Sequence, residues 1–129
     1  MNFRGGIVAI VLAAVLAGVA PSAARADGQA GKVKGYVLDS ACAFTKDLKK
    51  PVSVECAIAC AKEGSPLVIL TGDGHIYWPI SGKTPASGQN DRLLKFAGQK
   101  VVVTGKIYER NGARAIVIDT VEPETAGKK

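Results

Sequence analysis

The stretch KVVVTGKIYERNGARAIVIDTVE, residues 100–122, decides the fold, because it predicts two long strands joined by one tight turn. Asn111-Gly112 in its middle suits the positive φ angles of a two-residue hairpin turn. Positions equally far from that turn then face each other, so Glu109 lies opposite Arg114 with complementary charge. The same register predicts the facing pairs Ile107 with Ile116 and Gly105 with Ile118. It gathers five apolar side chains on one face: Val101, Val103, Ile107, Ile116 and Ile118.

Three shorter strands are predicted upstream of this hairpin. Residues 32–39, KVKGYVLD, are rich in β-branched and aromatic residues, and their internal glycine indicates a bend or a close approach of two backbones. Residues 66–80, PLVILTGDGHIYWPI, hold two apolar runs around Asp73-Gly74, a second dipeptide suited to a hairpin turn. Residues 81–92 are turn formers and predict a surface loop. The sequence therefore predicts a mainly β fold, a small five-stranded antiparallel barrel.

One short helix is predicted between the first and second strands. VECAIACAKEG, residues 54–64, is rich in alanine, follows Ser53 as a plausible N-cap, and ends at a glycine that can terminate a helix. Its two cysteines, Cys56 and Cys60, fall well off its apolar stripe. That stripe consists of Val54, Ala57, Ile58 and Ala61. Simple core packing therefore explains the cysteines poorly, unless this alanine-rich helix is buried on two sides.

The run LLKFAGQ, residues 93–99, followed by the hairpin of residues 100–122, resembles the closing half of an OB-fold barrel, where such a hairpin ends in an acidic residue and a proline. This resemblance implies a fold and no activity. The chain departs from the family because its helix precedes the second and third strands, whereas a typical OB-fold has its helix between the third and fourth. GYVLDSAC, residues 35–42, with CAIACAKEG, residues 56–64, also resembles a group of small secreted bacterial proteins, again without an implied activity.

The first 26 residues have the pattern of a secretory signal peptide. They begin with a single arginine, run through an apolar block from Ile7 to Ala20, and reach small residues with cleavage expected after Ala26. The apolar block is shorter than the roughly 20 residues needed to cross a bilayer, and no second such block follows. We therefore expect a periplasmic or secreted protein without a transmembrane anchor. Its mature chain, residues 27–129, is predicted to form one OB-like domain with frayed ends.

Composition narrows the range of partners. The chain has a formal charge of +6, and loss of Arg4 and Arg25 with the signal peptide leaves +4, spread without a run of five like charges. Aromatic residues make up only 5% of the chain, and export makes a nucleic acid an unexpected ligand. We therefore expect a metal ion or a protein as the partner. The aromatic residues that an OB-type surface would use for stacking are Tyr36, Tyr77, Trp78 and Tyr108.

The three cysteines Cys42, Cys56 and Cys60 carry the most specific chemistry in the sequence. The i, i+4 spacing of Cys56 and Cys60 places both sulfurs on one helix face, but the roughly parallel Cβ vectors disfavour a disulfide between them. Cys42 follows the first strand, and its connection to the helix is long enough to fold back. A cluster of all three thiolates is therefore geometrically easy. Such a cluster would suit a soft ion, either copper(I) or zinc with a fourth ligand.

Two other interpretations of the cysteines stay open. Because three cysteines cannot all pair within one chain, Cys42 could form a disulfide with Cys56 or Cys60 and leave one free thiol. The protein would then be a non-enzymatic module that binds a protein or a glycan through its barrel surface. Thiol redox chemistry is the third interpretation, although the C-x3-C spacing lacks the C-x2-C of thioredoxin-like sites.

Other polar residues are candidates for supporting roles. His75, the only histidine, could supply a fourth ligand if its turn folds over the helix, although an exposed turn residue is the simpler interpretation. Asp39 and Ser40 could contact a ligand from behind or simply form a turn. Because the lone histidine has no nucleophile near it in sequence, a binding protein is expected rather than an enzyme. A helix N-terminus and three nearby lysines would favour the thiolate of Cys56: Lys46, Lys49 and Lys50.

Overall fold

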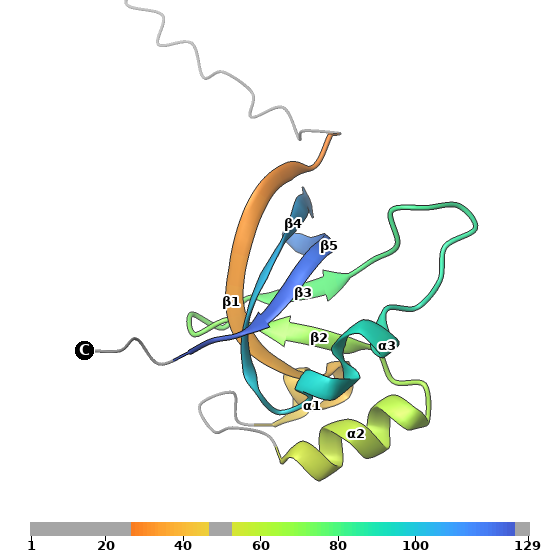
Figure 1. The fold of residues 1–129 in the computed structure, drawn as a ribbon, viewed down its shortest axis with the longest axis vertical. Helices are drawn as coiled ribbons and strands as arrows, with labels where there is room; N and C mark the ends of the chain where they lie inside the picture. The colour runs from red at the N-terminus through yellow and green to blue at the C-terminus, as the bar shows by residue number, and fades with distance from the viewer. Residues whose placement is uncertain (1–26, 47–52, 126–129) are drawn as a thin grey trace, which may run out of the picture.

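The structure is a computed structural model that describes residues 27–46 and 53–125. The signal peptide predicted over residues 1–26 lies outside these residues, as do Lys49 and Lys50. None of the helices in the described ranges has the length and apolar character needed to cross a bilayer. The described chain forms a closed barrel of five strands with short helices gathered at one end (Figure 1).

The barrel confirms the prediction of a mainly β fold, with its strands in the order β1-β2-β3-β5-β4 around the ring. The strands are β1 (Gln29–Asp39), β2 (Leu67–Leu70), β3 (Ile76–Pro79), β4 (Lys100–Arg110) and β5 (Ala113–Pro123). The prediction that all strands pair antiparallel is wrong, because β3 and β5 pair in parallel, with Tyr77 beside Arg114. The reason is topological: strand direction cannot alternate all the way around a closed ring with an odd number of strands.

The prediction of a single inserted helix is also incomplete. The predicted helix is α2 (Val54–Lys62), and the structure adds α1 (Ser40–Thr45), α3 (Asn90–Leu93) and the 3-10 turn η1 (Leu94–Phe96). The connection β1–α1–α2–β2 crosses one end of the barrel, and α3 lies at the same end (Figure 1). The added helices have only three to six residues each, too few to show a helical period in the sequence.

The β4–β5 hairpin confirms the predicted register. Asn111 and Gly112 form the turn with φ angles of 47° and 86°, and Glu109 faces Arg114 with Oε2 and Nε 3.3 Å apart. The register shifts by one residue between Thr104 and Gly105, whose partners are Thr120 and Ile118, so β5 carries a bulge at Asp119. A bulge strengthens the local twist, as closing a small barrel requires. The facing pairs Ile107 with Ile116 and Gly105 with Ile118 are also as predicted.

The core has two parts, which lie on opposite faces of β1 and β2. The larger part fills the barrel and contains Val33, Val37, Ala61, Leu67, Ile69, Leu93, Phe96, Val101, Val103, Ile116 and Ile118. The smaller part contains Leu38, Cys42, Ala43, Val68 and Leu70. Successive strand residues point to opposite faces, so Val37 enters the larger core and Leu38 the smaller one. Cys42, on the buried face of α1, therefore packs against the outer side of the barrel wall.

The close backbone approach predicted for the first strand occurs at Gly35. A Cβ atom at this position would clash with the carbonyl oxygen of Leu70 on the neighbouring strand β2. Only glycine lets the two backbones meet here, four residues before Asp39 ends β1 and α1 begins. The close pairing of β1 with β2 brings the two ends of the α1–α2 connection together.

The end of α2 is tied to the barrel by an αL turn and one asparagine. Gly64, with φ 95°, ends the helix as predicted, and Ser65 N donates to Cys60 O in the pattern of a Schellman motif. Asn90 at the start of α3 donates through Nδ2 to the carbonyls of Ser65 (2.9 Å) and Ala61 (3.3 Å). Its Oδ1 accepts from Leu67 N at 2.8 Å. One side chain thus joins α2, α3 and β2.

Replacement of Asn90 by alanine is expected to lower the free energy of unfolding by about 2–3 kcal/mol, because three partly buried hydrogen bonds of roughly 1 kcal/mol each are lost. Urea denaturation followed by circular dichroism measures the change. Gln89→Ala is the matched control, since the Gln89 side chain bonds only to the adjacent Ser87 and Gly88 carbonyls among the described residues. Equal stability of the two variants would contradict the role of Asn90.

Candidate metal centre

Asp39 lies where β1 ends and α1 begins. Its side chain is fully buried, and Oδ2 accepts hydrogen bonds from Cys42 N at 3.2 Å and Ser65 Oγ at 3.3 Å. The first of these bonds caps the N-terminus of α1. The other oxygen, Oδ1, is buried and has no hydrogen-bond donor among the described residues. Asp39 therefore performs the turn role considered from the sequence, and in addition presents one unpartnered carboxylate oxygen.

Cys42 is held one helical turn beyond Asp39. It is 6% exposed and packs with Leu38 and Val68 in the smaller core. Its Sγ lies 3.8 Å from Cys56 Sγ, well beyond the about 2.05 Å of a disulfide bond. All three cysteines are free thiols in the structure.

Cys56 and Cys60 face Asp39 from α2. Ser53 caps this helix as predicted, with its Oγ accepting from Cys56 N at 3.0 Å, and both cysteines are half-buried. The two Sγ atoms and a carboxylate oxygen of Asp39 all lie within 4.8 Å of one another. The structure thus brings together Asp39, Cys56 and Cys60, while Cys42 touches the group through Cys56.

The predicted apolar stripe of α2 is partly correct. Ala57 and Ala61 are buried, whereas Val54 at the first position of the helix is 42% exposed. Cys56 packs against the smaller core, so the helix is buried on two sides rather than one. This explains why Cys56 and Cys60 lie off the stripe and are still half-buried.

The surroundings of Cys42 and Cys60 disfavour loss of their protons in the metal-free protein. The pKa of Cys42 is raised to about 12. The largest cause is the neighbouring Asp39 side chain, and burial and the Cys56 thiol add smaller effects in the same direction. The pKa of Cys60 is also raised, first by desolvation and then by the negative charge of Asp39. A cation bound among these groups would reverse both effects, because it stabilises the deprotonated forms.

Cys42 in the metal-free, folded protein is expected to react slowly with iodoacetamide at neutral pH. Only the thiolate reacts, and below a pKa of about 12 the thiolate fraction grows with pH, so the rate should rise roughly tenfold for each pH unit. Mass spectrometry of labelled peptides between about pH 7 and about pH 9 measures the rate. The same cysteine in urea-unfolded protein is the control and should react faster. A fast, pH-independent reaction in the folded state would contradict the raised pKa.

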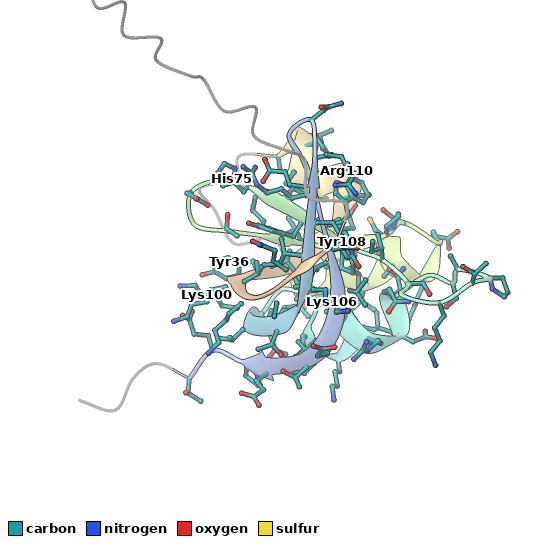
Figure 2. All side chains as sticks on the ribbon, turned by 90° about the horizontal axis from the view of Figure 1, so that it is seen from above. Tyr36, His75, Lys100, Lys106, Tyr108 and Arg110 are labelled. Atoms are coloured by element: carbon teal, nitrogen blue, oxygen red, sulfur yellow. The ribbon has the colours of Figure 1, made fainter. Side chains whose placement is uncertain are left out.

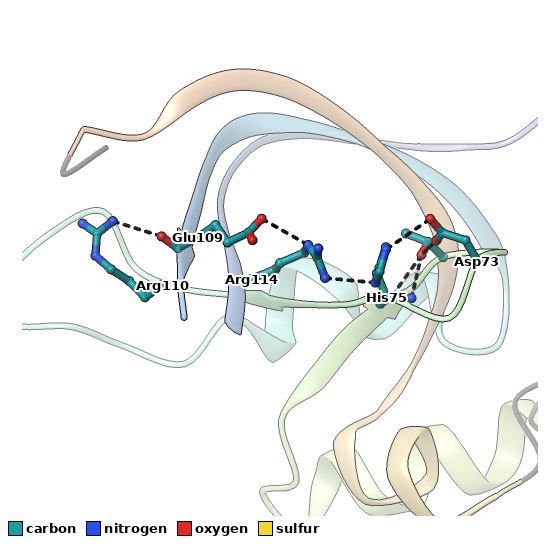
Figure 3. Close-up of polar contacts among 6 residues, drawn as sticks. Asp73, His75, Glu109, Arg110 and Arg114 are labelled. Carbon is teal, nitrogen blue, oxygen red and sulfur yellow. Dashed lines mark hydrogen bonds and ion pairs between the residues drawn. The ribbon is translucent and has the colours of Figure 1, made fainter. Parts of the chain in front are cut away.

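His75 lies in a different polar cluster. Its Nδ1 is 2.9 Å from Arg114 Nη1, and its Nε2 is 3.4 Å from Asp73 Oδ2. Because arginine can only donate, Nδ1 accepts and Nε2 carries the proton toward Asp73. Figure 3 shows the chain of contacts continuing from Arg114 to Glu109. The structure therefore places His75 with Asp73 and Arg114, and does not include it in the group formed by Asp39, Cys56 and Cys60.

The four aromatic candidates separate into two pairs. Tyr77 packs against the barrel core, and Trp78 packs against the smaller core that contains Cys42. Tyr36 and Tyr108 lie on the outer surface of β1 and β4, where Figure 2 shows them among basic side chains. The register places Tyr36 beside Lys100, while Lys106 and Arg110 flank Tyr108 along β4.

Comparisons with protein families, with curated proteins and with solved structures found no match to this chain. The sequence predicts the three cysteines as ligands and gives Asp39 only a supporting or turn role. The position of Asp39 offered one indication in the sequence: it ends a strand three residues before Cys42, and its side chain caps α1 by accepting a hydrogen bond from Cys42 N.

Proposed function

We propose that the protein is a periplasmic or secreted soft-metal-binding protein, in which Cys42, Cys56 and Cys60 supply thiolate ligands on the outer wall of an OB-like barrel. The sequence pattern of residues 1–26 supports export. The proximity of the cysteine sulfurs supports metal binding. Copper(I) and zinc are the ions that such thiolates favour.

The distance between Cys42 Sγ and Cys56 Sγ is the observation that carries this proposal. Two thiolates bound to one tetrahedral ion at the usual zinc–sulfur distance lie about 3.8 Å apart. The two sulfurs are 3.8 Å apart in the structure without a disulfide bond between them. Cys60 completes the set, because its sulfur lies within 4.8 Å of Cys56 Sγ and the Asp39 carboxylate.

A thiol count combined with metal titration tests this function. The exported protein is purified anaerobically, its free thiols are counted with a chromophoric reagent, and copper(I) and zinc are titrated separately. Three free thiols counted in urea, together with uptake of metal by the folded protein, would support the proposal. One free thiol and no metal uptake would overturn it and favour a structural disulfide.

A Cys42→Ser variant sharpens the same test. If Cys42 is a ligand, metal affinity falls strongly while the metal-free protein loses only modest stability, because a buried hydroxyl replaces the thiol. If Cys42 instead forms a disulfide, the variant loses roughly 2–5 kcal/mol of stability. Chemical denaturation with and without metal separates these outcomes.

The alternative function, a protein- or glycan-binding module, is favoured by one aromatic surface. Phe44 on α1 is 69% exposed, and its ring centroid lies 6.4 Å from that of Trp78. Both rings line a hollow of 320 Å³ that also contains His75 and Arg114. A Phe44→Ala variant that loses a captured glycan or protein, while binding metal normally, would support this second function.

A further inference from the structure

We infer that Asp39 is the fourth ligand of the cysteine site and makes it selective for a thiophilic divalent cation of the zinc class over copper(I). This inference rests on the proposed metal-binding function. It assigns to Asp39 a role beyond capping α1 and names the class of ion that the cysteines receive.

The hydrogen bonds of Asp39 leave one of its carboxylate oxygens available to a cation. Its side chain is fully buried, and two donors, Cys42 N and Ser65 Oγ, both bind Oδ2. Oδ1 receives no hydrogen bond within the described part of the chain. A buried carboxylate oxygen that lacks a hydrogen-bond donor lowers the stability of the folded protein. The Asp39 carboxylate shares one 4.8 Å group with Cys56 Sγ and Cys60 Sγ, which is where a cation would compensate that cost.

The position of Asp39 is fixed before any ion arrives. It ends β1, where its backbone pairs with Leu67 of β2, and its Oδ2 is bound from α1 and from the turn after α2. Ser65 is itself held by Asn90 through its carbonyl. Ligands oriented by such outer contacts bind metal more tightly, because little order has to be imposed on binding.

The donor set distinguishes the two candidate metals. Zinc accepts carboxylate oxygen together with thiolate sulfur in tetrahedral sites, whereas copper(I) is selected by sulfur donors. Charge favours the same choice. Three thiolates and one carboxylate carry four negative charges, of which a divalent ion leaves two uncompensated and a monovalent ion leaves three. Excess charge is costly here, because Asp39 and Cys42 are buried and the other two ligands are half-buried.

The experiment compares zinc and copper(I) affinities of the mature protein and its Asp39→Asn variant, using competition with chromophoric chelators. Asparagine keeps an oxygen that can accept from Cys42 N and Ser65 Oγ, but it removes the charged ligand. Zinc affinity is expected to fall at least about 100-fold, while copper(I) affinity changes less than about threefold. Cobalt(II) gives an independent readout, because its visible spectrum depends on the number and type of ligands.

Two further variants keep the test decisive. Ser65→Ala removes one donor to Oδ2 and leaves every ligand in place, so its loss of zinc affinity should be smaller than that of Asp39→Asn. Asp39→Ser provides the same comparison if the asparagine variant does not fold, since serine is also a good N-cap.

Each outcome has a distinct meaning. Zinc binding by Asp39→Asn as tight as that of the unaltered protein would overturn the role of Asp39 and leave the proposed function intact. Equal loss of zinc and copper(I) in a folded variant would overturn the selectivity. Failure of the unaltered, fully reduced protein to bind either metal would overturn the proposed function itself.

Discussion

Replacing Cys56 by serine is expected to reduce metal affinity far more than the roughly 10- to 100-fold loss that follows removal of a residue behind a ligand. Cys56 is the central residue of the cluster: its sulfur lies 3.8 Å from that of Cys42 and within 4.8 Å of Cys60 Sγ and the Asp39 carboxylate. Replacement of Cys56 removes one thiolate, and it also removes the sulfur that links Cys42 to Cys60 and Asp39. Isothermal titration with zinc under anaerobic conditions measures the change.

Glu55→Gln is the matched control for this variant. Glu55 neighbours Cys56 on α2, is exposed, and lies outside the ligand group. The zinc affinity of Glu55→Gln should stay close to that of the unaltered protein. This result would show that a substitution on the same turn of α2 does not by itself impair metal binding. Zinc binding by Cys56→Ser at the same affinity as Glu55→Gln would contradict the site, provided both variants have unchanged circular dichroism spectra.

Replacing Gly105 by alanine is expected to cause the largest loss of stability among single substitutions in the barrel wall. A Cβ atom there would clash with the carbonyl oxygen of Val117 and lie 3.2 Å from Asp119 N, both backbone atoms of β5. Backbone paired in a sheet cannot move aside as a flexible side chain can. We expect a loss of about 3 kcal/mol or more, a large part of the stability of a small domain.

The control for Gly105 is another glycine with open space around it. Gly72 lies in an exposed turn, and a Cβ atom there would meet no other part of the described chain within 4 Å. Gly72→Ala should therefore change stability by less than about 0.5 kcal/mol. Urea denaturation of both variants gives the comparison. If Gly105→Ala unfolds at the same urea concentration as Gly72→Ala, the close approach of β4 to β5 does not determine the stability of the wall.

Features encoded by neighbouring residues could be predicted from the sequence. The Asn111-Gly112 turn fixes the start of its own hairpin, so the facing pair of Glu109 and Arg114 follows without knowledge of the rest of the chain. The same holds for the N-cap of α2 at Ser53 and its end at Gly64. Each depends on a few adjacent dihedral angles.

Features that depend on closing the barrel could not be predicted in this way. The parallel pairing of β3 with β5 results from the number of strands in the ring, which no local pattern specifies. The role of Asp39 was missed for a related reason. In the sequence it is a polar residue before a serine, and only the packing of α2 over the end of β1 brings its carboxylate to Cys56 and Cys60.

All the proposed ligands come from a single connection between neighbouring strands. Asp39 ends β1, Ser65 precedes β2, and the three cysteines lie between them, while the other three strands of the described barrel supply no group to the site. The barrel and the site are consequently almost separate modules, and within the described part of the connection only Ala61 of α2 belongs to the barrel core. Changes confined to this loop can alter or abolish ion binding while the scaffold persists, so related chains with the same barrel need not share the same chemistry.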